Sequence, residues 1–339
     1  MRDFCESAVV FTDGDLIFYH IGYYVDDGYL VVCNGVNYLL TDGRYIESAR
    51  KIKKAECYLQ SELSLKDLLI KLGVKKLGLV YGYTSAKLYE ELLSLGYELF
   101  DYTAEYNELA SVKTFEQLEK IKKSCQICEQ AFIKTLPCIK EGITELELSA
   151  ELEHNFKRLG ATVGFNTIVA FGKGGSVPHY ETGNVKLKKD MPILMDFGCS
   201  YNGFLSDMTR TLFFGTPSTK FINAYEAVKK AHLKAFSEIR SGMTCSEADG
   251  VARGYLKAHG LDRYFAHSLG HGIGVKIHEY PTLNGRSQTV LKDGMVFSIE
   301  PGVYLENEFG IRIEDTVTLQ NGKCVSLMTT DKELLIIKG

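Results

Sequence analysis

The sequence predicts an α+β protein with two domains, a small α/β domain over residues 1–110 and a larger domain over residues 111–339. Three observations lead to this prediction. The chain has 339 residues, which is long for a single hydrophobic core. Short apolar runs separated by turns fill its first third, whereas long helical periodicity begins near Lys113. The second part also repeats itself at an offset of 100 residues, which indicates two similar halves.

The composition narrows the class of protein. Apolar residues make up 45% and charged residues 24%, which is ordinary for a globular protein. The net charge of -4, without a dense Lys/Arg cluster, argues against nucleic-acid binding. The opening residues are acidic and lack a long apolar run, unlike a signal peptide, and no stretch approaches the ~20 apolar residues of a membrane-spanning helix. We therefore expect no membrane partner. Nine cysteines cannot all pair, and without an export signal they predict a reduced, cytoplasmic protein.

In the first domain, residues 29–40 have two β-rich halves around Asn34-Gly35, a strong signal for a two-residue hairpin. Residues 50–54 and 64–72 have helical character. The run at 77–82 is typical of a buried strand. None of these segments carries an obvious chemical motif.

The second domain opens with one long helix, whose apolar residues recur at helical spacing: Phe115, Leu118, Ile121, Cys125, Cys128 and Phe132. Two of them, Cys125 and Cys128, have CxxC spacing. Because they lie on the apolar stripe, core packing is favoured over redox or zinc chemistry.

The internal repeat is clearest at two helix starts. Residues 142–147 (GITELE) are matched by residues 242–247 (GMTCSE). In both, a threonine can cap the helix while a glutamate at the third helical position bonds back, which makes a capping box. Both helices are expected to stop at a glycine, Gly160 and Gly260, in a left-handed conformation.

Each half ends in strands that carry two carboxylates. In the first half, Asp196 and Asp207 flank a turn at Asn202-Gly203. If that turn is a two-residue hairpin loop, Gly198 faces Asp207, and Asp196 lies on the same face two residues earlier. The aspartates are then diagonal neighbours, at most about 7–8 Å apart between Cβ atoms. Carboxylates this close in an apolar hairpin repel each other unless a cation lies between them.

The second half supplies Glu300 and Glu314, and we expect these to be close by analogy with the first half, because the longer loop between them hides the register. His271 lies in the second half, in a stretch with glycines at 270, 272 and 274, which argues against a helix. A helical zinc-protease HExxH motif is absent from the sequence.

Four carboxylates and one imidazole favour two hard-to-borderline divalent ions, such as manganese, over a thiolate-bound zinc. Two neighbouring metals can activate water and polarise a scissile carbonyl. Taken singly, each acid would more often be a solvated strand residue and the histidine a structural one. Five such residues together in apolar strands indicate a metal site.

These motifs resemble those of the pita-bread metallopeptidases, which include methionine aminopeptidase, Xaa-Pro aminopeptidase and prolidase. The resemblance covers residues 111–339 and is weaker before them. It implies a pita-bread (creatinase/aminopeptidase) domain with an internal pseudo-twofold repeat, which agrees with the duplication. It also implies a ribonuclease-H-like amino-terminal domain, of which Thr41 to Tyr45 looks like a fragment, and a homodimer.

The resemblance also implies roles for the five residues. Asp196 would bind one metal and His271 the other, Asp207 and Glu314 would bridge them, and Glu300 would be both a ligand and the general base. The cofactor would be two divalent ions per subunit, manganese first, with cobalt or zinc as alternatives.

Outside the metal ligands, His179 resembles the family's substrate histidine, and His278 looks like its partner on the opposite wall. The alternative for both is a buried, hydrogen-bonded histidine. Three further residues are similar to those of the proline-specific branch and would contact substrate: His267, Tyr304 and Arg312.

The resemblance predicts a peptidase that cuts the Xaa-Pro bond at the amino terminus of a peptide substrate. Many prolidases carry an arginine in an HExPR motif that grips the carboxylate of a dipeptide, whereas this chain has Thr282 there and its nearest arginine is Arg286. An aminopeptidase must leave that end open. We therefore expect an Xaa-Pro aminopeptidase, with prolidase as the alternative. Methionine aminopeptidase, a peptide-binding scaffold without activity and a creatine-type hydrolase rank below these two.

Overall fold

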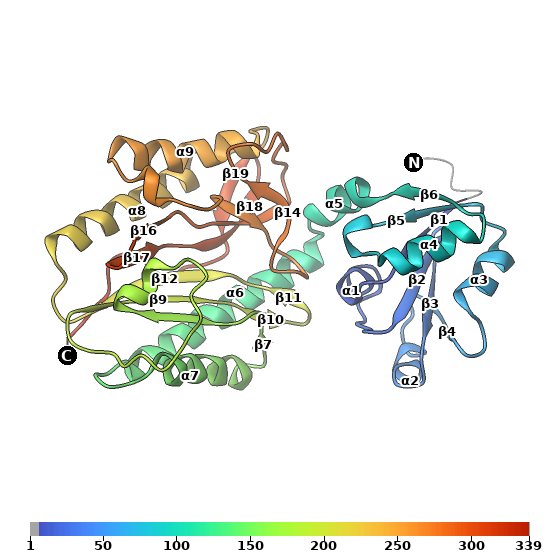
Figure 1. Ribbon diagram of the computed structural model, residues 1–339, viewed down its shortest axis with the longest axis horizontal. Helices are drawn as coiled ribbons and strands as arrows, with labels where there is room; N and C mark the ends of the chain where they lie inside the picture. The colour runs from blue at the N-terminus through green and yellow to red at the C-terminus, as the bar shows by residue number, and fades with distance from the viewer. Residues whose placement is uncertain (1–6, 339) are drawn as a thin grey trace. The chain divides into compact units, whose positions relative to one another are not determined.

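A computed structural model describes residues 7–338 of the chain, which divides into two compact units, Met1–Ala110 and Ser111–Gly339 (Figure 1). In the part that the structure describes, no helix has the length and apolar character needed to cross a bilayer. The eight described cysteines, from Cys33 to Cys324, are all free thiols.

The first unit is built on one six-stranded sheet with the order β4-β3-β2-β1-β5-β6. Its strands are β1 (Ser7–Phe11), β2 (Gly28–Cys33), β3 (Val36–Thr41), β4 (Glu56–Leu59), β5 (Lys76–Leu79) and β6 (Glu98–Asp101). Only β2 runs antiparallel to its neighbours, which gives the mixed sheet of a ribonuclease-H-like domain. The helices are α1 (Gly14–Ile21), α2 (Ile46–Ala49), α3 (Leu65–Leu72), α4 (Ala86–Ser94) and α5 (Thr103–Ser111).

Local signals in this unit were mostly correct. The β2–β3 hairpin closes at the predicted turn, where Asn34 and Gly35 have φ values of 50° and 77° and Cys33 pairs with Val36. Helix α3 occupies its predicted segment, whereas β5 covers only the first half of the run at 77–82, because a 3-10 turn begins at Tyr81. The helix expected over residues 50–54 was wrong, because α2 is one turn that ends at Ala49, and only Ile52 in the following segment is apolar.

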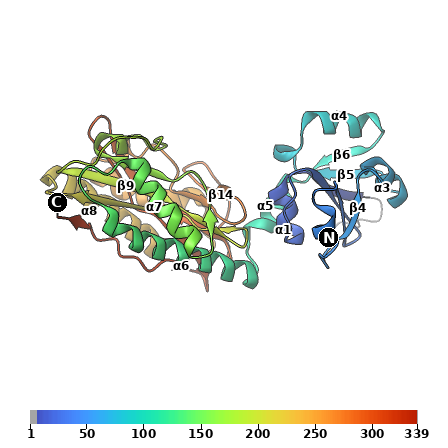
Figure 2. The ribbon, with the colours of Figure 1, turned by 90° about the horizontal axis from the view of Figure 1, so that it is seen from below.

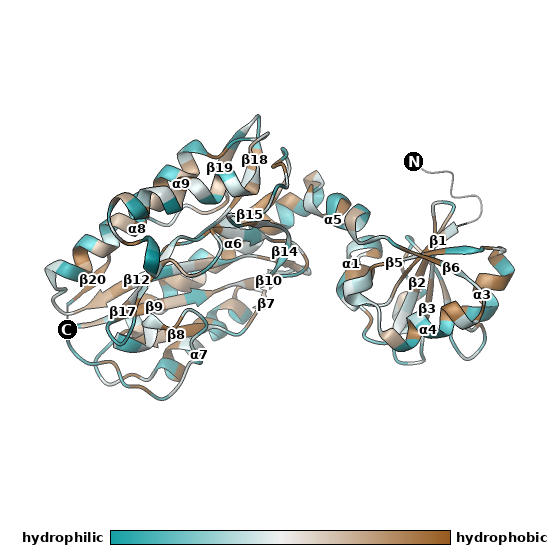
Figure 3. Ribbon diagram, turned by 45° about the horizontal axis from the view of Figure 1, so that its top comes forward, coloured by the Kyte–Doolittle hydropathy of each residue, from teal (hydrophilic) through white to brown (hydrophobic). Residues whose placement is uncertain are grey.

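The second unit has two pairs of helices with strands between them (Figures 1 and 2). One pair is α6 (Phe115–Thr135) with α7 (Glu145–Arg158), and the other is α8 (Thr219–Glu238) with α9 (Cys245–Ala258). Helix α6 lies against β10 and β11, whereas α8 lies against β15 and β19. In Figure 3, α8 and α9 alternate between apolar and polar colour, as expected of helices with one buried face.

The strands of this unit form four sheets. The four-stranded sheet has the order β20-β12-β9-β8, and the five-stranded sheet β14-β13-β15-β18-β19. Two small sheets, β11-β10-β7 and β16-β17, complete the unit. The strand bounds are β7 (Thr162–Val163), β8 (Ile168–Phe171), β9 (Met191–Phe197), β10 (Cys199–Tyr201), β11 (Phe204–Leu205), β12 (Met208–Phe214), β13 (Gly270–Gly272), β14 (Glu279–Leu283), β15 (Val296–Ile299), β16 (Gly302–Leu305), β17 (Phe309–Arg312), β18 (Asp315–Gln320), β19 (Lys323–Ser326) and β20 (Ile336–Ile337).

The 100-residue repeat is present in three dimensions. Helices α7 and α9 begin 100 residues apart, and both have a capping box, Thr144 with Glu147 and Thr244 with Glu247. Gly160 and Gly260 follow them with φ values of 86° and 70°, as predicted. The apolar stripe of α6 is buried at its centre, where Cys125 and Cys128 pack in the core.

Candidate metal centre

Four of the five candidate ligands lie at strand ends of two hairpins, and the fifth, His271, lies in β13. In the first hairpin, Tyr201 pairs with Phe204 and Asp196 pairs with Thr209. This register agrees with the one predicted from the Asn202-Gly203 turn, and it sets Asp207, two residues before Thr209, diagonally across from Asp196. Gly198 is required between them, because a Cβ there would lie 2.0 Å from the carbonyl oxygen of Ser206.

The second hairpin has a register that the sequence did not reveal. Ile299 of β15 pairs with Asp315 of β18, so Glu300 and Glu314 come next on either side. The segment between them forms its own hairpin, β16–β17, and the Ile313 N–H donates to Pro301 O at 3.4 Å. The two glutamates are thus brought opposite each other.

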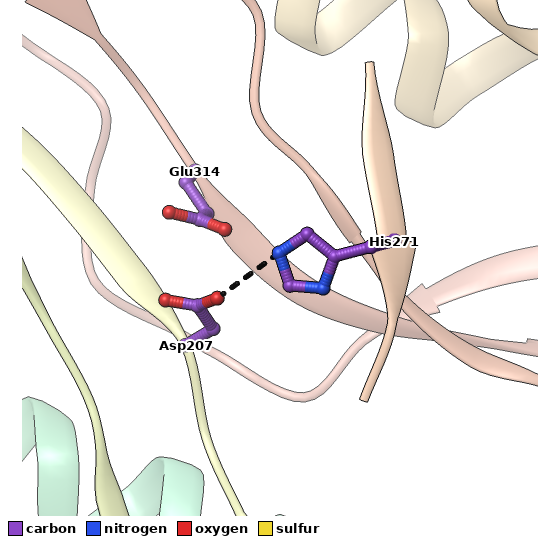
Figure 4. Close-up of side chains that lie close together, drawn as sticks. All are labelled: Asp207, His271 and Glu314. Carbon is purple, nitrogen blue, oxygen red and sulfur yellow. Dashed lines mark ion pairs between the residues drawn. The ribbon is translucent and has the colours of Figure 1, made fainter. Parts of the chain in front are cut away.

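Three of the predicted ligands converge tightly. One ligand atom each of Asp207, His271 and Glu314 lies within 4.8 Å of the others (Figure 4). His271 Nε2 is 3.4 Å from Asp207 Oδ2 and also 3.4 Å from Glu300 Oε1, so the fourth residue adjoins the cluster.

The fifth residue, Asp196, is held from the side. Its Oδ2 accepts a hydrogen bond from Arg312 Nη2 at 2.5 Å, while its Oδ1 has no hydrogen-bond partner within residues 7–338. Arg312 Nε also donates to Thr209 Oγ1 at 3.0 Å, and Thr209 Oγ1 in turn donates to Glu314 Oε2 at 2.6 Å. Arg312 therefore links one ligand directly and another through a hydroxyl.

The protein alone does not stabilise the negative charges of the carboxylates at this centre, as the direction of their pKa shifts shows. Burial raises the pKa of Asp207 and of Glu314 well above the ordinary range, and the neighbouring carboxylates add to the rise. Burial likewise raises the pKa of Glu300 to about 8. Burial lowers the pKa of His271, which favours the neutral imidazole that can bind a metal.

The donor set fits divalent cations. Asp196 Oδ1, Asp207 Oδ1 and Glu314 Oε1 are buried and have no hydrogen-bond partner among the described residues. Buried carboxylate oxygens without donors are costly unless a cation compensates them. Carboxylate oxygens with one imidazole suit hard-to-borderline ions.

A chain of hydrogen bonds extends from the centre through the three residues predicted to contact substrate. Arg312 Nη1 donates to Tyr304 Oη at 2.6 Å, and Tyr304 Oη lies 2.8 Å from His267 Nε2. Since the tyrosine oxygen accepts from arginine, its own proton is directed to His267 Nε2. Burial lowers the pKa of His267 to about 3, consistent with a neutral ring whose Nδ1–H donates to Ser268 O.

His179 and His278 are themselves exposed, so the alternative of two buried, hydrogen-bonded histidines was wrong. The His278 ring contacts the His271 ring edge-on, with 4.4 Å between centroids. His179 is close enough to His267 and His278 to contribute to the lowering of their pKa values.

Three residues that support the site were not found from the sequence. Thr209 bonds Glu314, and Ser298 Oγ donates to Glu300 Oε1 at 3.1 Å while accepting the His271 N–H. Arg210 Nη1 donates to the Glu314 carbonyl at 2.6 Å. For Arg210, the signal available in the sequence was a charged residue within the apolar run that follows Asp207.

Comparison with known proteins agrees with this architecture. Residues 119–321 match metallopeptidase family M24, and residues 4–134 match the creatinase/prolidase N-terminal domain. An Xaa-Pro dipeptidase of Pyrococcus furiosus is 39% identical over 67% of this chain and 66% of its own length. An uncharacterized peptidase of Bacillus subtilis, YqhT, is 31% identical over 98% of this chain and 96% of its own.

Solved structures are similar over nearly the whole chain. The X-Pro aminopeptidase of Thermotoga maritima superposes with a TM-score of 0.90 at 30% identity, covering 98% of this chain and 97% of that one. An Xaa-Pro dipeptidase of Bacillus anthracis gives 0.93 at 31% identity, covering 97% and 95%. These likenesses confirm the predicted pita-bread fold and its amino-terminal domain.

Proposed function

The chain belongs to metallopeptidase family M24, and on that premise we propose that it hydrolyses the Xaa-Pro bond at the amino terminus of peptides. The five clustered residues, Asp196, Asp207, His271, Glu300 and Glu314, would hold two divalent ions, with manganese as the first candidate and cobalt or zinc as alternatives. Bound there, the ions would supply Lewis acidity toward the scissile carbonyl and a more acidic water. This assignment is supported by the three buried carboxylate oxygens that lack a hydrogen-bond partner among the described residues.

Glu300 is the general base of this proposal. Its carboxyl lies beside His271, and burial raises the pKa of this carboxyl above the ordinary glutamate range, which makes its ionised form a stronger base toward the attacking water. Ser298 fixes one of its oxygens. The other oxygen would take the proton of the attacking water and return it to the proline nitrogen as the peptide bond breaks.

The two exposed histidines, His179 and His278, would contact the substrate. His278, against the His271 ring, and His179 would donate hydrogen bonds to the carbonyl oxygen or to the leaving side of the substrate. His267, Tyr304 and Arg312 are joined to one another and to Asp196, so their role would be to shape the site and orient a ligand.

One observation carries the choice of an aminopeptidase over a dipeptidase. A dipeptidase needs a fixed cation for the free carboxylate of its substrate. The Arg312 side chain is only 4% exposed and already donates to Thr209, Tyr304 and Asp196. Thr282, where many prolidases have arginine, is exposed and uncharged. The carboxyl side of the site would therefore stay open to longer peptides.

A dipeptidase is the second candidate, because two Pyrococcus relatives are named Xaa-Pro dipeptidases. In that case exposed Arg286 would be the residue to grip the carboxylate.

The deciding experiment is a paired assay of the manganese-loaded protein on Ala-Pro and Ala-Pro-Ala, with a chelated control and Met-Ala-Ser as a third substrate. We expect metal-dependent cleavage with preference for Ala-Pro-Ala. Preference for Ala-Pro would favour the dipeptidase, and processing of Met-Ala-Ser the methionine-specific activity. Absence of metal-dependent cleavage, or full activity in Asp207→Ala, would overturn the proposal.

A further inference from the structure

A buried glutamate, which is not one of the proposed metal ligands, accepts hydrogen bonds from both ends of the segment that carries His179. Glu145 is the first residue of α7 and is fully buried. Its Oε1 accepts the Phe171 N–H at 2.7 Å, and its Oε2 accepts the Gly183 N–H at 3.0 Å and the Tyr180 O–H at 3.1 Å. One carboxylate therefore holds both ends of segment 171–183 and the side chain next to His179.

The backbone around Glu145 makes this a firm support. The Glu145 N–H donates to Val185 O at 3.1 Å, and the Leu146 N–H donates to Gly183 O at 3.0 Å, so the start of α7 is fixed to one end of the segment. The carboxylate then reaches across to the other end at Phe171. Three donors satisfy a buried charge that would otherwise be costly.

The second half of the repeat provides an internal comparison. Cys245 is the first residue of α9, at the position that corresponds to Glu145 in the repeat, and it is equally buried. Its N–H donates to Thr289 O at 2.8 Å, in the manner of Glu145 to Val185. Since α9 begins with the same capping box, this helix start does not require a carboxylate. The glutamate occurs only in the half that carries His179.

The segment also faces the metal centre. Gly175 approaches Gly310 so closely that a Cβ on Gly310 would lie 1.8 Å from the Gly175 carbonyl oxygen. Arg312 Nη1 lies 3.4 Å from Pro178 O, one residue before His179. A shift of the segment would therefore move His179 relative to Arg312 and its partners.

We propose that Glu145 is a positioning residue, which fixes segment 171–183 so that His179 is presented to the substrate. This inference rests on the proposed function, in which His179 contacts the substrate. Glu145 itself does not touch the metal ligands in the contacts described, so its effect should pass through His179. A misplacement of about 1 Å at a group that contacts substrate can cost up to about 100-fold in activity.

The test is a double-mutant cycle on the full chain, loaded with manganese and assayed on Ala-Pro-Ala. We expect Glu145→Gln to lower kcat/KM by roughly 10–100-fold with unchanged metal content. In the His179→Ala background, Glu145→Gln should change kcat/KM by less than about twofold, because the residue through which it acts is already missing. The matched control is Glu147→Gln, which alters the same helix start but keeps a residue that can form the capping box. It should stay within about twofold of the wild type.

Hydrogen exchange adds a readout that does not depend on activity. Amides of residues 172–183 should exchange faster in Glu145→Gln and remain unchanged in Glu147→Gln. If Glu145→Gln does not fold, Tyr180→Phe removes one of the three donors and should give a smaller loss that also vanishes in the His179→Ala background. Losses that multiply in the double variant, or wild-type kcat/KM in Glu145→Gln, would refute the positioning role. An inactive wild type would instead refute the proposed function. An unaffected His179→Ala in an active enzyme would refute the substrate role of His179 and, with it, the positioning role of Glu145.

Discussion

Removal of the metal ions should make the stability of the protein fall as the pH rises from 7 to 8. Burial raises the pKa of Glu300 to about 8 and raises the pKa values of Asp207 and Glu314. Without metal, the folded chain therefore keeps protons that the unfolded chain has already released at pH 7. Raising the pH removes these protons and leaves buried carboxylates facing one another. The histidines whose pKa values are lowered on folding act in the opposite direction, but in the unfolded chain, with pKa values of about 6.5, they are mostly neutral by pH 7 and together offset less than about 1 kcal/mol of the loss.

The magnitude follows from the pKa shift. One pKa unit corresponds to about 1.4 kcal/mol. For Glu300, with a pKa that moves from 4.5 to about 8 on folding, the difference in bound protons integrated from pH 7 to 8 gives a loss of about 1 kcal/mol. Asp207 and Glu314 act in the same direction, so the total loss should exceed this figure.

The assay is urea unfolding of the full chain in chelator at pH 7 and at pH 8, followed by circular dichroism because the chain has no tryptophan. The matched control is Glu300→Gln, whose amide does not titrate, and its loss over the same pH step should be smaller by about 1 kcal/mol. Manganese should abolish most of the loss in the wild type. Equal stability of the chelated wild type at both pH values, or an undiminished loss in Glu300→Gln, would refute this account of the site.

Three further perturbations test the surroundings of the centre. Arg312→Lys keeps the charge but loses the planar fork, so kcat/KM should fall by about 10–100-fold, with weaker metal binding by titration calorimetry. Lys113→Met leaves Glu279, which is 11% exposed, without its ion-pair partner at 2.7 Å, and should lower the free energy of unfolding by about 3–5 kcal/mol, with partial recovery when Glu279→Gln is added. Gly198→Ala places a Cβ 2.0 Å from a carbonyl oxygen and should lower both the melting temperature and activity, whereas Gly250→Ala, with open space in α9, should stabilise by up to about 1 kcal/mol.

The elements that the sequence predicted are those with local physical causes. The capping boxes of α7 and α9 depend on residues three apart, and the turn at Asn202-Gly203 sets the register of its own hairpin. That register was enough to place Asp207 diagonally from Asp196. The alternation of successive side chains between the two faces of a strand then gave the face on which both lie.

The sequence did not reveal the strand register that places Glu300 opposite Glu314, because this register depends on pairing between strands that are not joined by a short turn. Glu300 and Glu314 are brought opposite by β15 and β18, whose pairing is closed by a second hairpin between them, and no turn residue encodes that register.

The sequence by itself therefore determined the duplication, the boundaries of α7 and α9 and the set of proposed ligand residues, because periodicity, caps and turns act over a few residues. Only the tertiary structure decided how these residues are used. It brought Arg312 Nη2 into hydrogen-bonding contact with Asp196 Oδ2, because a partly buried carboxylate needs a donor, and it placed the Glu145 carboxylate in contact with both ends of the segment that carries His179. Burial and long-range contacts, which decide where a charge is stabilised, exist only once the two halves have packed together.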